Sequence, residues 1–325
     1  MQRIVIDTDP GVDDALAIVL AFRSPELRVE AITTVSGNVH VEQTTRNALM
    51  LVDLLDPVPR PPVARGAAQP LRRPLVDAAS VHGADGIGDL GRFQEVRGAP
   101  RYPEPRSRPA DLAGPAQILE VVRRHPGEVV LVAIGPLTNV ALALREDAGA
   151  MRRLRGLVVM GGAVAGPGNI TPAAEFNMFV DPEAAEAVFG AGLPLTLVGL
   201  DVTRRVSISR ARLRAALGDA PGRIGRFLLD ATGRAFEFGE SRRGSAELTL
   251  HDPLAVGVVI DPSLVRTEPL AIRVETGSDL TRGLTLADRR PIKPQFKTSP
   301  NAHVCLEVDG ERFLRLFEER VCRSW

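Results

Sequence analysis

Residues 3–15 read RIVIDTDPGVDDA. The apolar opening of this stretch predicts a short buried strand over residues 3–7. The Pro-Gly pair that follows predicts a sharp turn, after which the chain enters a helix over residues 13–22. A strand, a tight turn and a helix in this order form the repeating unit of a parallel α/β sheet.

The same stretch holds four carboxylates, those of Asp7, Asp9, Asp13 and Asp14. The first two lie two residues apart on a strand and face the same way, and the other two fall in the first turn of the helix. A helix N-terminus favours one or two carboxylates, but four like charges at a few ångströms raise one another's pKa. A hard divalent cation with oxygen ligands resolves this conflict, so the pattern favours a Ca²⁺ or Mg²⁺ site over a helix cap in a solvated acidic loop.

Outward from this stretch, short apolar runs alternate with helical patterns. The predicted strands are 3–7, 28–34, 128–134, 156–161 and 194–198, and the predicted helices between them are 13–22, 41–55, 136–145 and 182–190. This alternation predicts an α/β fold with a mainly parallel (mixed) central sheet and helices on both faces. Such sheets bind ligands beyond the carboxyl ends of their strands, where the acidic residues fall.

Two regions depart from this rhythm. Residues 66–110 are rich in Gly, Pro and Arg and are expected to form loops. The later elements are predicted as helices at 209–217 and 221–238, a helix after Asp252, strands at 269–274 and 302–308, and a final helix at 310–321. There is no internal repeat and no clear linker, so residues 1–325 are expected to form a single domain.

The composition excludes several classes of protein. The 325 residues carry 40 basic and 40 acidic side chains, so the zero net charge removes the electrostatic argument for a nucleic-acid partner. Two cysteines, Cys305 and Cys322, suggest neither a disulfide framework nor a zinc cluster, and Cys305 in an apolar run is expected to be a small buried residue. The N-terminus does not resemble a signal peptide and no run is apolar enough for a bilayer, so no membrane partner and a cytoplasmic location are expected.

The acidic stretch resembles the N-terminal signature of the inosine-uridine nucleoside hydrolase family, Asp-X-Asp-Pro-Gly-X-Asp-Asp. Further motifs of that family follow in order over nearly the whole chain, at Thr33–Asn38, Gly135–Asn139, Met160–Gly162, Ala174–Asn177, Asp181–Ala185 and His251–Leu254. The resemblance implies a Rossmann-like open α/β fold. It also implies hydrolysis of the N-glycosidic bond of ribonucleosides, such as inosine and uridine, to free base and ribose in nucleoside salvage or catabolism. Relatives are homodimers or homotetramers, so self-association is expected by analogy.

The resemblance also implies the metal site. Ca²⁺ would be bound by the side chains of Asp9, Asp14 and Asp252 and by the backbone carbonyl of Ile134, with water and the ribose 2′- and 3′-hydroxyls completing the shell. The cation would lower the pKa of the attacking water and fix the sugar by its diol. Asp9 would in addition act as the general base that takes the proton of this water.

Five further residues would bind the ribose hydroxyls: Asp13, Asn38, Asn169, Glu175 and Asn177. Amides and carboxylates match the donors and acceptors of a sugar, and nearby negative charge stabilises an oxocarbenium-like transition state. Met160 would pack near the sugar, although a methionine in an apolar strand is more often a core residue.

Two histidines are candidates for contact with the base. His251 directly precedes the metal ligand Asp252 and is the preferred general acid for the departing base, because its near-neutral pKa suits that role. His82 lies in a glycine-rich loop that approaches the base in relatives, and it is the second candidate. The chain departs from its relatives in lacking tyrosines over residues 226–250, where it has phenylalanines and arginines instead, so the base preference stays open.

Two rival functions fit the sequence less well. A haloacid-dehalogenase-type Mg²⁺ phosphohydrolase needs Asp-X-Asp-X-Thr/Val and a downstream lysine, whereas Pro10-Gly11 follows the acidic pair and Lys293 and Lys297 are poorly placed. The glycine run at 161–166 also lacks the spacing of a dinucleotide-binding loop. A non-catalytic nucleoside-binding protein would not need to keep both a general base and a general acid.

Overall fold

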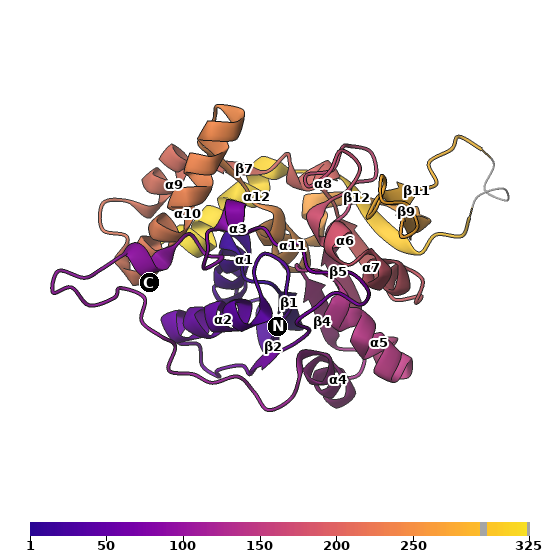
Figure 1. The fold of residues 1–325 in the computed structure, drawn as a ribbon, viewed down its shortest axis with the longest axis horizontal. Helices are drawn as coiled ribbons and strands as arrows, with labels where there is room; N and C mark the ends of the chain where they lie inside the picture. The colour runs from indigo at the N-terminus through magenta and orange to yellow at the C-terminus, as the bar shows by residue number, and fades with distance from the viewer. Residues whose placement is uncertain (293–297, 324–325) are drawn as a thin grey trace.

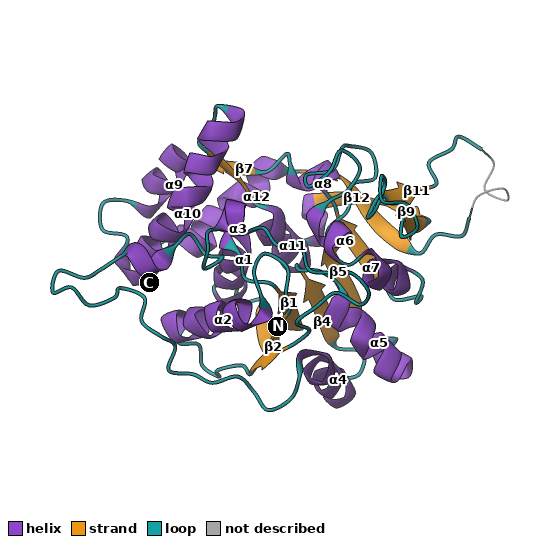
Figure 2. Ribbon diagram, in the orientation of Figure 1, coloured by secondary structure: helices purple, strands orange, loops and turns teal. Residues whose placement is uncertain are grey.

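The computed structural model describes residues 1–292 and 298–323, and its main sheet has eight strands. This sheet runs through the centre of the structure (Figures 1 and 2). In spatial order the strands are β3 (Val63–Arg65), β2 (Leu27–Thr34), β1 (Gln2–Thr8), β4 (Val129–Ala133), β5 (Gly156–Met160), β6 (Leu195–Val198), β12 (Ala302–Val308) and β9 (Val265–Leu270). All neighbours pair in parallel except β12 and β9, which are antiparallel. The predicted mainly parallel, mixed sheet is confirmed.

The central strands are buried on both faces. In β1, Ile4 and Ile6 pack into one hydrophobic cluster while Val5 packs into a second cluster on the opposite face. Neighbouring β4 divides in the same way, with Val132 on the first face and Leu131 on the second. Burial on both faces explains why these strands are apolar throughout rather than alternating.

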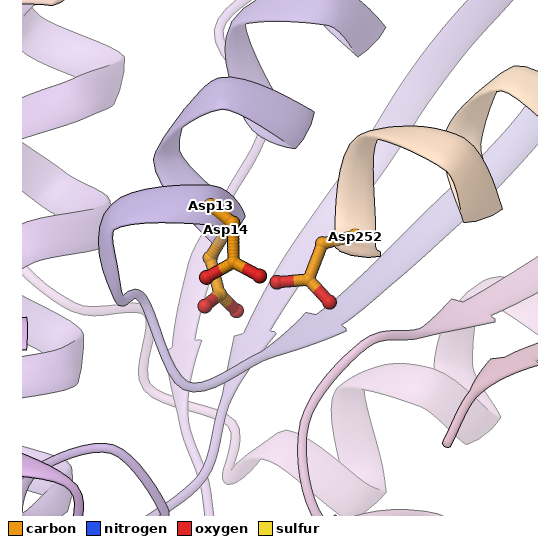
Figure 3. A group of neighbouring side chains, drawn as sticks. All are labelled: Asp13, Asp14 and Asp252. Atoms are coloured by element: carbon orange, nitrogen blue, oxygen red, sulfur yellow. The ribbon is translucent and has the colours of Figure 1, made fainter. Parts of the chain in front are cut away.

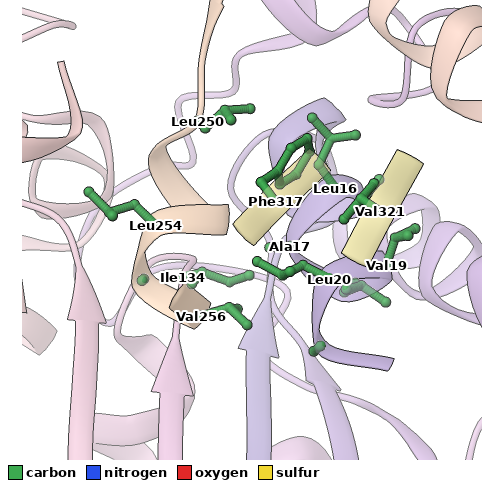
Figure 4. Packing of buried hydrophobic residues seen from close by; sticks show 14 of the residues in the cluster. Leu16, Ala17, Val19, Leu20, Ile134, Leu250, Leu254, Val256, Phe317 and Val321 are labelled. Atoms are coloured by element: carbon green, nitrogen blue, oxygen red, sulfur yellow. The ribbon is translucent and has the colours of Figure 1, made fainter. Parts of the chain in front are cut away.

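Helices cover both faces of the sheet. The first face carries α1 (Val12–Phe22), α2 (Val41–Leu55), α9 (Arg210–Leu217), α10 (Gly222–Arg243), α11 (His251–Ile260) and α12 (Gly310–Phe317), and the second carries α4 (Gly114–Arg124), α5 (Thr138–Met151) and α7 (Pro182–Phe189). Figure 4 shows the contact between α1 and the C-terminal segment, where Leu16 lies beside Phe317 and Val321. This packing joins the two ends of the chain.

Several elements differ from the sequence-based expectation. Helix α4 was not predicted, and the run expected as one strand over 269–274 divides into β9 and β10 (Ile272–Val274). The division has a local cause, because the side chain of Asn301 bonds both the N–H and the C=O of Ile272, at 2.8 and 2.9 Å. Strand β10 then pairs with β11 (Thr285–Ala287) in a separate two-stranded sheet.

A second two-stranded sheet joins two short strands that are distant in the sequence. It pairs β7 (Ser207–Ser209) with β8 (Glu247–Thr249) and encloses the helical excursion made by α9 and α10. Sequence patterning missed it because each strand has three residues and the partner lies about forty residues away. Strand β8 of this pair is followed by Leu250, which directly precedes α11.

Residues 66–110 are mainly loop, as expected, with one short helix, α3 (Ala79–His82), and a 3-10 turn at Leu90–Arg92. Cys305 and Cys322 are both buried, and burial raises the pKa of each thiol to about 12, which confirms the structural interpretation of Cys305. Among the described residues, no helix has the length and apolar character needed to cross a bilayer.

Candidate active site

The candidate site lies where the order of the strands reverses. Strand β1 has β2 on one side and β4 on the other, and the chain moves outward from this point in both directions. Asp9, Asn38, Ile134 and Met160 lie at or just beyond the carboxyl ends of β1, β2, β4 and β5. Parallel strands bring these ends to one edge, which is where open α/β sheets bind ligands.

Three carboxylates converge at this edge (Figure 3). Asp13 and Asp14 project from the first turn of α1, and Asp252 projects from the first turn of α11. Each offers an oxygen that lies within 4.8 Å of the others. Two helix N-termini therefore present their positive ends to one cluster of negative charge.

Asp9 lies behind this cluster and is held by close backbone. Its Oδ2 accepts the N–H of Asn38 at 2.7 Å, while its Oδ1 is buried without a hydrogen-bond partner in the described part of the chain. A Cβ at Gly37 would lie 2.0 Å from Oδ2, and one at Gly135 would lie 2.6 Å from Oδ1. The space around this carboxylate exists only because both neighbours are glycine.

Asp14 also caps its own helix. Its Oδ2 accepts the N–H of Gly11 at 2.9 Å, and its Oδ1 accepts the hydroxyl of Thr8 at 2.6 Å. The helix-cap reading of the acidic stretch therefore holds for this one carboxylate. It does not account for Asp13 and Asp252, whose oxygens lie beside it.

Asp7 does not join the other carboxylates of the N-terminal stretch. Its Oδ1 accepts hydrogen bonds from Thr33 Oγ1 at 2.5 Å and Asn139 Nδ2 at 2.7 Å inside the sheet, and burial raises its pKa to about 7. The expectation that all four carboxylates meet was wrong for Asp7. Side chains two apart on a strand do face one way, but the chain leaves the strand after Thr8 and carries Asp9 in another direction.

Negative charge on the clustered carboxylates is unfavourable unless a cation neutralises it. Burial first, and then the charge of Asp14, raises the pKa of Asp9 well above its usual range. Burial followed by the other three carboxylates does the same for Asp252, and burial raises the pKa of Asp13 to about 6. Closely spaced oxygen ligands, an unpartnered Oδ1 and raised pKa values together fit a hard divalent cation.

A cavity of about 290 Å³ opens above the carboxylates. Ten of the twelve site residues predicted from the sequence line it: Asp13, Asn38, His82, Ile134, Met160, Asn169, Glu175, Asn177, His251 and Asp252. The other two, Asp9 and Asp14, are buried behind it. Met160 serves in both ways considered for it, since it packs in the hydrophobic core and also lines the cavity.

Backbone contacts orient the polar lining. Asn177 donates from Nδ2 to the carbonyls of Ile134 at 3.0 Å and Met160 at 3.2 Å. Glu175 accepts the N–H groups of Gly162 and Asn177, each at 3.0 Å, and caps the short helix α6 (Phe176–Val180). These side chains are thus fixed before a ligand arrives.

Both candidate histidines line the cavity with one ring nitrogen already engaged. Nδ1 of His82 accepts the N–H of Val12 at 3.1 Å, so the neutral imidazole carries its proton on Nε2. Burial lowers the pKa of His82, against the opposing effect of Asp14. Nδ1 of His251 lies 2.8 Å from the hydroxyl of Thr203.

An apolar wall completes the cavity and was not predicted from the sequence. It consists of Val12, Ala78, Val81, Ile170, Phe176, Ala235, Phe238 and Leu248. Of the three phenylalanines noted over 226–250, Phe227 and Phe236 are buried in the core and Phe238 alone faces the cavity. Phe238 lies on a different face of α10 from Phe236, two residues before it. The composition of the segment alone does not predict which phenylalanine lies on which face.

Comparisons with known proteins point to one family. The family described as inosine-uridine preferring nucleoside hydrolase matches residues 4–315. The chain is 41% identical to the non-specific ribonucleoside hydrolase RihC of Klebsiella pneumoniae, covering 96% of this chain and 95% of that protein. It is 38% identical to the pyrimidine-specific ribonucleoside hydrolase RihA of Enterobacter sp. (strain 638), covering 98% and 97%. Among solved structures, the purine-preferring ribonucleoside hydrolase from Gardnerella vaginalis superposes with a TM-score of 0.89 at 34% identity, covering 99% and 98%.

Proposed function

The chain belongs to the inosine-uridine preferring nucleoside hydrolase family and is a hydrolase of N-glycosyl bonds, and from this premise we propose that its activity depends on Ca²⁺. The substrates are purine and pyrimidine ribonucleosides, and the products are free base and ribose. The observation that carries the proposal is the convergence of Asp13, Asp14 and Asp252 beneath a cavity lined by two histidines.

The proposed ligands of the cation are the carboxylates of Asp9, Asp14 and Asp252 and the carbonyl oxygen of Ile134. Hard oxygen donors in this number suit Ca²⁺, which accepts a flexible shell of six to eight oxygens. When bound, the cation supplies charge that makes a water more acidic and that orients the ribose diol. Asp13 lies within 4.8 Å of two of these ligands and would reach the same diol.

Asp9 is the proposed general base. Its Oδ1 is buried and unpartnered among the described residues, while the N–H of Asn38 holds Oδ2. The carboxylate is therefore anchored at one oxygen and available at the other. A base with one fixed oxygen takes the proton of the attacking water with little reorganisation.

His251 is the proposed general acid. As the C1′–N bond breaks, its electron pair goes to the base, and a ring nitrogen of the base takes the proton from Nε2 of the imidazolium. The water oxygen bonds to C1′, and the proton of the water goes to Asp9. The carboxylates of Asp13 and Glu175 line the cavity and would stabilise positive charge on the sugar ring.

The test uses purified protein with inosine, uridine and their 2′-deoxy counterparts, in Ca²⁺ and after chelation. The release of reducing sugar should require the cation and should fall strongly for the 2′-deoxynucleosides, because one of the two hydroxyls that the site holds is missing. Equal rates on uridine and 2′-deoxyuridine would contradict the proposed pose. Full activity after exhaustive chelation would contradict the metal.

We further propose a cytoplasmic role in nucleoside salvage or catabolism and assembly as a homodimer or homotetramer, both from the family resemblance. Sedimentation velocity at micromolar concentration measures the assembly directly. A monomer at all concentrations would remove that part of the proposal without affecting the hydrolytic chemistry.

A further inference from the structure

We propose that Thr203 is a positioning residue that holds the imidazole of His251 with Nε2 directed at the departing base. The inference rests on the proposed function, since it assumes that His251 acts on the leaving group. It adds a residue outside the cavity to the machinery of the reaction.

The contact is buried and directional. Thr203 is the last residue of α8 (Leu200–Thr203), is fully buried and does not line the cavity, whereas His251 does. Its hydroxyl lies 2.8 Å from Nδ1 of His251 and forms no other hydrogen bond within residues 1–292 and 298–323. Nδ1 therefore faces Thr203, which lies outside the cavity, and Nε2 is on the opposite side of the ring.

The backbone fixes the distance between the two residues. Leu200 donates its N–H to Gly162 O at 2.8 Å, which ties α8 to the loop after β5. Leu250, the residue before His251, donates its N–H to Val206 O at 3.0 Å, and Val206 donates to Thr203 O at 3.0 Å. The hydroxyl and the imidazole are thus carried by segments that are bonded to each other.

A hydroxyl is suited to this position by its chemistry. Its oxygen can accept the proton carried on Nδ1, and Nδ1 keeps this proton both in the imidazolium and in the neutral ring that remains after Nε2 has given up its proton. The ring can therefore give up the proton on Nε2 and regain it without rotating.

The experiment compares Thr203→Val with the wild type on two substrates. Valine keeps the shape of threonine but removes the hydroxyl, so the imidazole loses its anchor. We expect kcat for inosine to fall about 10- to 100-fold with KM nearly unchanged, because misorientation of a reacting group typically has effects of this size. The rate on p-nitrophenyl riboside, whose leaving group departs without a proton, should stay within a factor of about two.

Controls separate orientation from stability. Thr232→Val makes the same change at a buried threonine whose hydroxyl bonds the backbone carbonyl of Leu228 at 2.7 Å, and it should leave both rates unchanged. Thr203→Ser retains the hydroxyl and should restore the rate on inosine. In the wild type, the ¹⁵N resonance of His251 Nδ1 should report a hydrogen bond that Thr203→Val abolishes.

The outcomes distinguish this inference from the proposed function. If Thr203→Val slows both substrates equally or neither, or if the ¹⁵N signal does not change, the positioning role is wrong. If Thr203→Val does not fold, the result from Thr203→Ser and the wild-type ¹⁵N signal still decide. If the wild type hydrolyses no nucleoside at all, the proposed function fails first, and the ¹⁵N comparison alone reports on the contact.

Discussion

The charge of the Asp252 carboxyl is unfavourable in the metal-free protein, because burial and three neighbouring carboxylates raise its pKa well above the usual range. Asp252→Asn removes the charge and keeps the shape. We expect it to abolish Ca²⁺ binding measured by calorimetry and to lower kcat/KM by about three orders of magnitude, since metal assistance is worth several kcal/mol. At neutral pH in EDTA, its thermal midpoint should rise above that of the wild type.

Asp14→Ala offers a contrasting variant. This carboxylate accepts hydrogen bonds from Thr8 and Gly11 at the start of α1, so its loss also removes a helix cap. Both variants relieve buried like charge, but only Asp14→Ala loses a cap, so in EDTA we expect its unfolding free energy in urea to be about 0.5–2 kcal/mol below that of Asp252→Asn. If both variants are equally stable in EDTA, the cap described for Asp14 contributes nothing.

Gly37 and Gly135 give a second test at single residues. A Cβ at either position would meet an oxygen of the Asp9 carboxylate at 2.0 or 2.6 Å, so that side chain must move. Gly37→Ala and Gly135→Ala should each lower kcat by about 100-fold, because a shift of about 1 Å in a catalytic group has this effect. Gly91→Ala is the control, since no atom lies within 4 Å of the added carbon, and it should keep the wild-type rate.

Between elements, the buried carboxyls of β1 and of the first turn of α1 contribute to the pH dependence of the metal-free protein. The folded pKa of Asp13 is about 6 and that of Asp7 about 7, both above the 3.8 of the free side chain. In this window the folded state binds protons more tightly than the unfolded state, so stability falls as pH rises from about 4 to 7. Thermal midpoints in EDTA should decline over that range, and saturating Ca²⁺ should reduce the decline. A rising midpoint in EDTA would contradict the raised pKa values.

Helix α10 is tied to the loop that carries His82. Asp230 of α10 accepts hydrogen bonds from Tyr102 Oη at 2.7 Å and Arg101 Nη1 at 2.8 Å, and Arg234 bonds Asp89 at 2.6 Å. Tyr102→Phe deletes one bond to a charged acceptor and should lower the unfolding free energy by about 1.5–3 kcal/mol in urea titration. A change below about 0.5 kcal/mol would mean that the Tyr102 hydroxyl adds little to the two arginine bonds that remain.

The elements show which features a sequence can predict. Strands such as β4 and β5 were predicted because they are buried on both faces and therefore apolar at every position. The ordered motifs also identified residues around the cavity, and three of them, Thr33–Asn38, Gly135–Asn139 and Met160–Gly162, lie at the carboxyl ends of strands of the main sheet. Other features were missed. The β7–β8 strand pair depends on pairing between distant segments, the exposure of Phe238 to the cavity depends on the helical phase of α10, and the contact of Thr203 with His251 depends on side-chain direction. The local pattern of apolar and polar residues contains no information about these three features.

For the whole molecule, we propose that residues 1–325 form one domain whose two ends stabilise each other. Arg320 donates to Glu26 at 2.8 Å, and Phe313 and Phe317 are fully buried in the cluster that contains α1. Deleting the chain after Asp309 removes both phenylalanines, each worth about 1.5–3 kcal/mol of burial against a total stability of about 5–15 kcal/mol. We expect the full chain to unfold in one calorimetric transition and the truncated chain to show none. Phe313→Leu should give a lower midpoint with the single transition retained.

The strand order at the far edge of the sheet has a consequence for biosynthesis. Strand β9 is made before β12 but lies outside it, so β9 has no place in the main sheet until Ala302 and the residues after it have emerged. At about 5–20 residues per second, the 32 residues from Leu270 to Ala302 take roughly two to six seconds. During that interval the outer edge of β6 is open on the ribosome, and an open edge is a template for aggregation. A nascent chain stalled between these two strands already contains every candidate catalytic residue and should recruit a chaperone more strongly than one stalled after Val308.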